Sequence, residues 1–316
     1  MTTEQMLWNR VFKKPIKGAE KFYKYFRIKS IKDLSEWVFL IDQIADCYNL
    51  KGKKLIDIGA GYGLISILFA LKGAEVVALD MDKESCEQLK VVLKHGFRDI
   101  KVKVKLASAL TIPYENESFD IAFANEVISH ASNPSQFIKE SARVLHKKGC
   151  LILSDTNKNC LINRFYLAKK KYKALDQYFY YNNSYLVLSY VHGKSLFVKT
   201  KDLNYIIKNT YGMTRKEINN IIDNYESGDN YRKLIKKYKP PFPFRDPDTG
   251  YYYEHFFSPV ELSEICRQSF PFKSVVSKSA VNSRFRLVAP LLYKNPFNCL
   301  IGASISSKYF VIAQKA

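Results

Sequence analysis

Three glycines follow an aspartate closely at residues 57–63, which read Asp-Ile-Gly-Ala-Gly-Tyr-Gly. Because glycine has no Cβ atom, such a segment turns sharply and lets a ligand approach the backbone. The apolar run before it predicts a strand, and the apolar residues after it predict a helix. The first turn of that helix offers unpaired N–H groups and a positive dipole end. The segment is therefore a candidate binding loop for a nucleotide-like ligand.

A second acidic residue, Asp80, ends the next predicted strand. It follows the glycines by about 20 residues, the separation at which a carboxylate accepts hydrogen bonds from ribose hydroxyls. Nicotinamide dehydrogenases also bind a ribose through an acidic residue at this position, but their glycine motif is G-x-G-x-x-G. This chain has G-x-G-x-G, and Leu64 stands where the third dehydrogenase glycine would be. The glycine spacing therefore favours a cofactor other than a nicotinamide dinucleotide. The alternative to a binding loop is a tight turn that binds no ligand.

Three further segments follow in order with tight spacing. Residues 108–114 read Ser-Ala-Leu-Thr-Ile-Pro-Tyr, residues 117–126 run from Glu-Ser-Phe-Asp to Asn-Glu, and His130 comes next. With the glycine loop and Asp80, they resemble the class I S-adenosylmethionine-dependent methyltransferase domain of the group that methylates small molecules and quinones. That domain has a D-A-x-x-L-P-F segment, an S-F-D strand start and a V-L-x-H segment. The resemblance covers residues 50–155, with weaker agreement at 256–280 and 305–315.

The resemblance implies that S-adenosylmethionine is the cofactor. Gly59, Gly61 and Asp57 would surround its methionine part, while Asn125 and Glu126 would lie near the sulfonium and the acceptor. The implied cofactor-binding residues are Asp57, Gly59, Ala60, Gly61, Gly63, Asp80, Met81, Ser108, Ala109, Asn125 and Glu126.

Ser108 departs from the family pattern, which usually has an aspartate there to bind the adenine amino group. Its hydroxyl can still form a hydrogen bond, with Ala109 beside the ring, or a backbone group can serve instead. The same departure supports an alternative in which the chain binds S-adenosylmethionine without catalysing transfer.

Strand and helix patterns alternate around these residues, which predicts crossover connections and a parallel sheet. We predict an α/β fold with a Rossmann-like, seven-stranded, mostly parallel sheet flanked by helices. A mainly helical insert, or cap, would lie between strands 5 and 6. Strands are expected at 54–58, 75–79, 100–106, 119–124, 150–154, 273–277 and 309–313, and helices at 35–48, 64–71, 83–94, 134–145 and 258–269.

Composition divides the chain into three parts. Residues 1–50 form an N-terminal helical cover, and residues 51–156 with 258–316 form the methyltransferase domain. Residues 157–257, rich in Tyr, Asn and Lys, form the inserted helical and aromatic cap that would bind the acceptor. Helices are expected within this cap at 161–175, 200–209 and 214–225.

A hydroxyl acceptor would benefit from a general base, because methyl transfer then starts from an activated nucleophile. His130 follows the fourth strand, at the sheet edge where ligands bind, and His255 is the second candidate. Tyr251, Tyr253 and His192 are candidate acceptor contacts in the cap. Each has a structural alternative: His130 as a capping or core residue, and the aromatic cluster around His255 as packing.

The formal net charge of +20 has two explanations. It could attract an anionic partner such as nucleic acid, or it could reflect a composition rich in Lys, Ile, Asn and Tyr. We favour a small-molecule acceptor, methylated on an oxygen or a carbon atom, because Asn-Glu-Val-Ile follows the fourth strand where DNA amino-methyltransferases carry Asn-Pro-Pro-Tyr. An RNA methyltransferase stays as the alternative.

The cysteines and apolar runs set the remaining expectations. Six cysteines without zinc or disulfide spacing predict reduced thiols, no metal site and a cytoplasmic protein. The apolar stretches at 290–293 and 296–305 suit either burial or peripheral membrane contact with a glycan- or lipid-linked acceptor. Nothing in the sequence predicts an oligomeric state.

Overall fold

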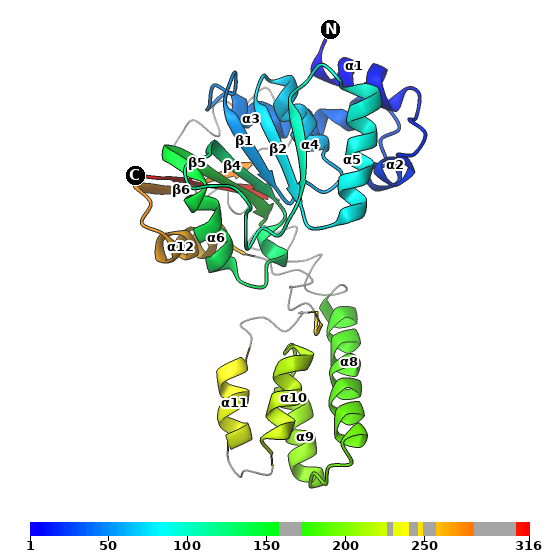
Figure 1. Ribbon diagram of the computed structural model, residues 1–316, viewed down its shortest axis with the longest axis vertical. Helices are drawn as coiled ribbons and strands as arrows, with labels where there is room; N and C mark the ends of the chain where they lie inside the picture. Colours follow the sequence, from blue (N-terminus) through cyan, green and yellow to red (C-terminus); the bar gives the residue numbers. More distant parts are fainter. Residues whose placement is uncertain (158–171, 226–229, 240–245, 249–256, 281–307) are drawn as a thin grey trace. The chain divides into compact units, whose positions relative to one another are not determined.

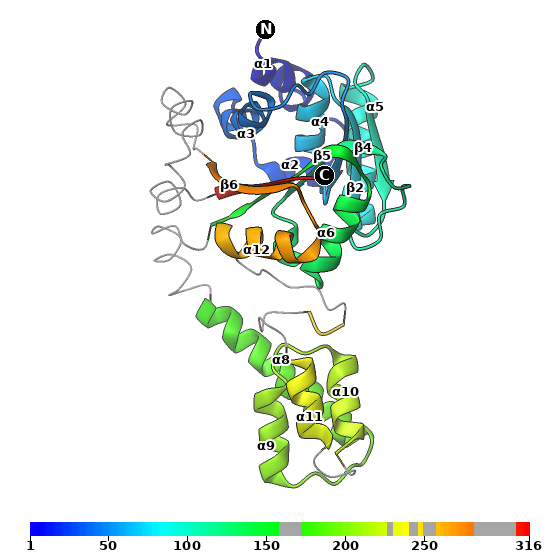
Figure 2. The same ribbon diagram turned by 90° about the vertical axis from the view of Figure 1, so that its left-hand side faces the viewer.

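The computed structural model describes residues 1–157, 172–225, 230–239, 246–248, 257–280 and 308–316. The chain divides into two compact units (Figures 1 and 2). The sheet unit comprises Met1–Ile128, Asn133–Cys160 and Phe257–Ala316, and the helical unit comprises Ser129–Ser132 and Leu161–Phe256.

The sheet unit is built on seven strands in the order β3-β2-β1-β4-β5-β7-β6. The first five strands pair in parallel, and β7 lies antiparallel between β5 and β6. The predicted seven-stranded, mostly parallel sheet is therefore confirmed. The strands are β1 Lys54–Ile58, β2 Glu75–Asp80, β3 Val102–Leu106, β4 Phe119–Asn125, β5 Leu145–Thr156, β6 Ser274–Ala280 and β7 Lys308–Gln314.

The strand order places the carboxyl ends of β1 and β4 side by side at the centre of the sheet. In open α/β sheets the chain connections leave on opposite sides at such a switch point, and ligands bind in the crevice that results. The loop after β1 and the residues after β4 are therefore brought together by topology alone.

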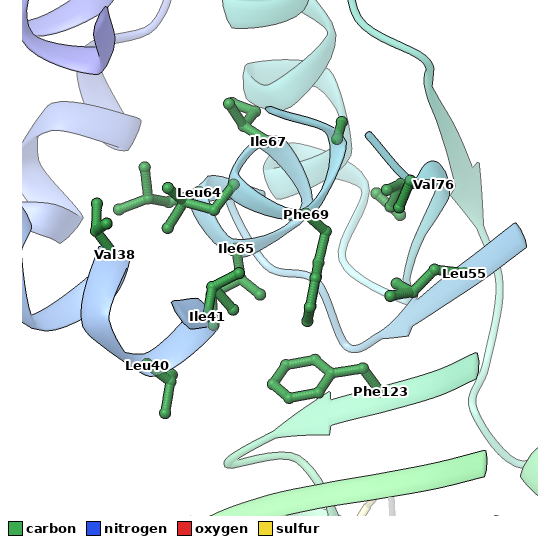
Figure 3. Close-up of a cluster of buried hydrophobic side chains, with 14 of the residues drawn as sticks. Val38, Leu40, Ile41, Leu55, Leu64, Ile65, Ile67, Phe69, Val76 and Phe123 are labelled. Atoms are coloured by element: carbon green, nitrogen blue, oxygen red, sulfur yellow. The ribbon is translucent and has the colours of Figure 1, made fainter. Parts of the chain in front are cut away.

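Helices cover both faces of the sheet (Figure 2). On one face, Phe69 of α4 packs edge-on against Phe123 of β4, with ring centroids 4.9 Å apart. Val38 and Ile41 of α3 point toward Leu64 of α4 in the same cluster (Figure 3). The helices of this unit after the N-terminal segment are α3 Ser35–Ala45, α4 Leu64–Leu71, α5 Lys83–Gly96, α6 Pro134–Arg143 and α12 Pro259–Ser269.

The N-terminal segment joins the same core. It forms α1 Thr3–Leu7, a π-helical turn at Trp8–Phe12, α2 Glu20–Phe26 and a 3-10 turn at Ile31–Leu34. Phe22 of α2 is fully buried. The side chain of Gln88 on α5 accepts the N–H of Lys21 at 3.1 Å and donates to the carbonyl of Gly18 at 3.1 Å. These contacts dock α2 onto α5.

The helical unit has its own core. It contains α8 Tyr172–Gly193, α9 Thr200–Asn209, α10 Arg215–Asp223 and α11 Asn230–Tyr238, packed around buried side chains such as Val187, Ile206 and Ile222. Thr214 and Glu217 form the predicted capping box at the start of α10. The helix expected at 161–175 lies mostly outside the described residues.

The sequence patterns predict neither α11 nor the part of α8 beyond residue 175. Tyr and Asn recur throughout α8, so its sequence lacks a clean apolar stripe, and propensity alone is a weak guide.

Within the described residues, no helix is both long and apolar enough to cross a membrane.

Candidate active site

The glycine loop turns through positive φ at each of its three glycines. The φ angles are +73° at Gly59, +53° at Gly61 and +81° at Gly63. A Cβ atom on Gly59 would lie 2.3 Å from Cγ2 of Val127, and one on Gly63 would lie 2.4 Å from Cδ1 of Leu89. A Cβ on Gly61 would meet no atom of the described residues within 4 Å. Positive φ and the neighbouring side chains therefore favour glycine at 59 and 63, whereas Gly61 faces open space.

Asp80 ties this loop to the end of β2. Its Oδ2 accepts the N–H of Gly61 at 2.7 Å, and its Oδ1 accepts the N–H of Asp82 at 2.8 Å. The N–H groups of Gly59 and Ala60 donate to the carbonyl of Leu79. Each carboxylate oxygen has a second lone pair, so Asp80 can still accept hydrogen bonds from hydroxyl groups of a ligand. Met81, beside it, is exposed.

Asp57 lies behind the loop rather than on its surface. Its side chain is buried in β1, and Oδ2 accepts a 2.5 Å hydrogen bond from the hydroxyl of Ser66 on α4. Burial raises the pKa of Asp57 to about 7; the Ser66 hydrogen bond opposes this shift, and the nearby charge of Asp80 adds to it. A direct contact between Asp57 and the methionine part of a cofactor stays a prediction.

The raised pKa of Asp57 makes stability depend on pH. Between its usual pKa of 3.8 and the folded value of about 7, the folded state holds a proton that the unfolded state releases. We expect the free energy of unfolding to fall as pH rises through this window, by at most about 1.4 kcal/mol per pH unit for one group, and to level off above it. Asp57→Asn removes this contribution while its amide oxygen still accepts from Ser66.

Urea unfolding of wild type and Asp57→Asn from pH 4.5 to 7.5 measures the effect. The variant should show a flatter profile, so that its stability relative to wild type increases with pH. Parallel profiles would contradict the assignment of the titration to Asp57.

The segment predicted beside adenine is held by α6. Arg143 donates to the carbonyls of Tyr114 and Ile112, each at 2.8 Å, and Glu140 accepts the N–H of Ile112 at 2.9 Å. The hydroxyl of Ser108 accepts the N–H of Leu110 at 3.1 Å. These bonds fix the loop after β3, while adenine contact by Ser108 and Ala109 stays a prediction.

The carboxyl ends of β4 and β5 present buried polar atoms. Asn125 and Ser154 are register partners on these neighbouring strands. Among the described residues, neither the Oδ1 of Asn125 nor the Oγ of Ser154 has a hydrogen-bond partner, although both atoms are buried. Buried polar groups are normally paired, so this edge is suited to a polar ligand or an ordered water.

Glu126 follows directly, with φ at +55°. Left-handed backbone is rare for residues other than glycine and concentrates at functional sites. Its Oε1 accepts a hydrogen bond from Thr156 at 3.0 Å and forms an ion pair with Lys308 of β7 at 3.1 Å. Residues of two strands, β5 and β7, therefore hold this carboxylate in place.

The predicted acceptor-side residues are spread over the chain. His130 is exposed at the end of the 3-10 turn Ile128–His130, a few residues after β4 in sequence, and His192 is exposed in the last turn of α8. His255, Tyr251 and Tyr253 lie outside the described residues. The catalytic and acceptor-binding roles of all five stay predictions.

Three residues at this edge of the sheet unit were not identified from the sequence. Ser154 could have been found, since it is a polar residue ending an apolar strand. Tyr62 lies within the glycine loop itself. Tyr25 of α2 stacks against Tyr62 with ring centroids 5.0 Å apart, and no local pattern signals this contact.

Comparison with known proteins places the fold in a family. Residues 56–153 match the family model described as "Methyltransferase domain". The chain is 30% identical over 155 residues to an uncharacterized protein of Methanocaldococcus jannaschii, covering 49% of this chain and 67% of that protein. Over 109 residues it is 35% identical to a ubiquinone biosynthesis O-methyltransferase of Pelagibacter ubique, covering 34% of this chain and 44% of that protein.

A second ubiquinone biosynthesis O-methyltransferase, from Xanthomonas oryzae, is 32% identical over 120 residues, covering 37% of this chain and 49% of that protein. The match thus spans about half the length, or less, of these O-methyltransferases. A solved structure of a Pyrococcus horikoshii protein is 14% identical, with a TM-score of 0.49 over 93% of this chain and 99% of that one. With the matched domain and the switch-point loop described above, the chain belongs to the class I S-adenosylmethionine-dependent methyltransferases.

Proposed function

We propose that this chain transfers the methyl group of S-adenosylmethionine to an oxygen atom of a small molecule. The observation that carries the proposal is the glycine loop, which Asp80 ties to β2 while Gly61 faces open space. The names of the ubiquinone biosynthesis O-methyltransferases support a hydroxyl acceptor on a small molecule.

The residues at the loop fit the cofactor in three respects. A side chain at Gly61 would fill space that a ligand could occupy. Asp80 keeps acceptor capacity for ribose hydroxyls, and the buried Oδ1 of Asn125 lacks a partner among the described residues. When bound, S-adenosylmethionine supplies a methyl group already activated by the sulfonium charge. The contribution of the protein is then to orient the acceptor and exclude water.

The acceptor side needs a group that takes the hydroxyl proton. His130 is the proposed base, because it ends the short turn that follows the carboxyl end of β4, and His255 is the alternative. Tyr251, Tyr253 and His192 are proposed acceptor contacts. Glu126 is held by Thr156 and Lys308. A carboxylate fixed in this way is suited to positioning the acceptor.

Calorimetry with S-adenosylmethionine and an acceptor screen with radiolabelled cofactor test the proposal. We expect binding, and label transfer to one or more small hydroxylated molecules. Label transfer to RNA with strong salt dependence would favour the nucleic-acid alternative. Cofactor binding without any labelled product would favour a non-catalytic binding protein, and no binding at all would overturn the assignment.

Once an acceptor is found, His130→Ala is expected to lower kcat by about 10²–10⁴-fold, the usual contribution of a general base. Cofactor affinity should be unchanged. His95→Ala, which removes an exposed imidazole on α5, is the matched control. An unchanged kcat in His130→Ala together with a large loss in His255→Ala would transfer the role to His255.

A further inference from the structure

Tyr25 brings an aromatic ring from the N-terminal cover to the glycine loop. Its ring lies 5.0 Å from the ring of Tyr62 at an interplanar angle of 42°, and 5.0 Å edge-on from Phe26. Phe26 in turn packs edge-on against Trp37 of α3 at 5.5 Å. Although these contacts hold its ring, Tyr25 is 63% exposed. A positioned but exposed aromatic residue beside an open loop is a candidate ligand contact.

The ring contact with Tyr62 places Tyr25 at the sheet edge, because Tyr62 belongs to the glycine loop that follows β1. The pKa of the Tyr25 phenol is raised by burial first, and then by the charges of Glu126, Tyr62 and Asp80. Asp80 ends β2 and Glu126 follows β4, and β1 lies between these two strands. Tyr25 therefore lies beside the loop at the carboxyl end of β1, and the charges of both carboxylates act on its phenol.

This placement distinguishes the parts of a bound cofactor. If the proposed function holds, the ribose lies at Asp80 and the acceptor lies near Asn125 and Glu126. The sulfonium is the part of S-adenosylmethionine that lies between its ribose and the acceptor. We propose that the rings of Tyr25 and Tyr62 contact the sulfonium end of the cofactor, so that the N-terminal cover favours the charged donor over the neutral product.

The chemistry of a tyrosine ring suits this role. The face of an aromatic ring carries negative potential and attracts a cation within about 6 Å of its centroid. S-adenosylmethionine has a positive sulfur, whereas S-adenosylhomocysteine, left after transfer, has a neutral one. The rings would therefore strengthen binding of the donor more than binding of the product, which also assists product release. The ring, rather than the hydroxyl, performs this task, since the phenol keeps its proton at neutral pH.

Calorimetry on the full chain with both ligands tests this inference. Tyr25→Leu should weaken binding of S-adenosylmethionine about tenfold and that of S-adenosylhomocysteine less than about twofold, the range expected for one cation–π contact. Tyr25→Phe keeps the ring and should bind both ligands as wild type does. Lys24→Ala, on the same helix, is the matched control and should change neither affinity.

Tyr62→Leu tests the same proposal at the ring that belongs to the glycine loop. Thermal unfolding of each variant reports whether it is folded. The same selective loss of donor binding is expected. Equal loss of both ligands, or no loss in either leucine variant, would overturn the role of the rings. Failure of wild type to bind either ligand would instead contradict the proposed function itself, so the two failures are distinguishable.

Discussion

Asp80→Ala is expected to weaken binding of S-adenosylmethionine by about 100-fold or more. Hydrogen bonds to a charged group contribute about 1.5–3 kcal/mol each, and about 2.7 kcal/mol corresponds to 100-fold in affinity. The variant loses the ribose acceptor, and it also loses the carboxylate that accepts the N–H of Gly61 at 2.7 Å. The loop and the ligand are thus affected together.

Calorimetry on wild type and three variants measures this loss. Asp80→Asn keeps one acceptor oxygen and should lie between wild type and Asp80→Ala. Asp99→Ala removes an exposed carboxylate that pairs with Arg10, and it should bind as wild type does. An Asp80→Ala protein that binds with wild-type affinity would place the cofactor elsewhere.

The second large effect concerns the glycines. Gly59→Ala is expected to lower the free energy of unfolding by about 2–5 kcal/mol. Left-handed backbone costs a residue with a Cβ about 1–2 kcal/mol, and overpacking adds about 1–3 kcal/mol. The new Cβ would meet Val127 at 2.3 Å, and a β-branched side chain is stiff at χ1 and yields little.

Substitutions at the three glycines should affect the free energy of unfolding and the affinity for the cofactor to different degrees. Gly61→Ala places its Cβ in open space, so it should cost only about 1–2 kcal/mol of stability while weakening cofactor binding. Gly63→Ala should fall between, because it meets the flexible end of Leu89. Urea unfolding and calorimetry on the three variants check the order. If Gly59→Ala were no less stable than Gly61→Ala, the packing argument would be wrong.

The sheet and its central loop could be predicted because their signals are local. A buried strand, closely spaced glycines and a helix fit into residues 54–71, and Asp80 is marked by its distance from them. The structure confirms the sheet and its mostly parallel pairing. The assignment of individual cofactor and acceptor residues stays a prediction that the variants above would test.

The remaining features depend on contacts between distant residues. Tyr25 contacts Tyr62 because α2 docks on α5 through Gln88. Hydrophobic periodicity in the sequence does not predict such a contact. Ser154 becomes notable only when β5 is placed in register with β4. Most of helix α8 was missed because burial of Leu186 and Val187 in a local core, rather than a regular apolar stripe, accounts for its position.

The place of β7 has a consequence for how the chain matures. β7 is synthesised after every other described strand, yet it lies between β5 and β6. Until it leaves the ribosome, the apolar edge of β5 has no partner on that side, and Glu126 lacks the charge of Lys308. Open strand edges invite pairing with other chains, so a folding molecule whose β7 has not yet inserted is the form most exposed to aggregation. Closing the sheet and fixing the Glu126 carboxylate are then one event, the insertion of β7 between β5 and β6.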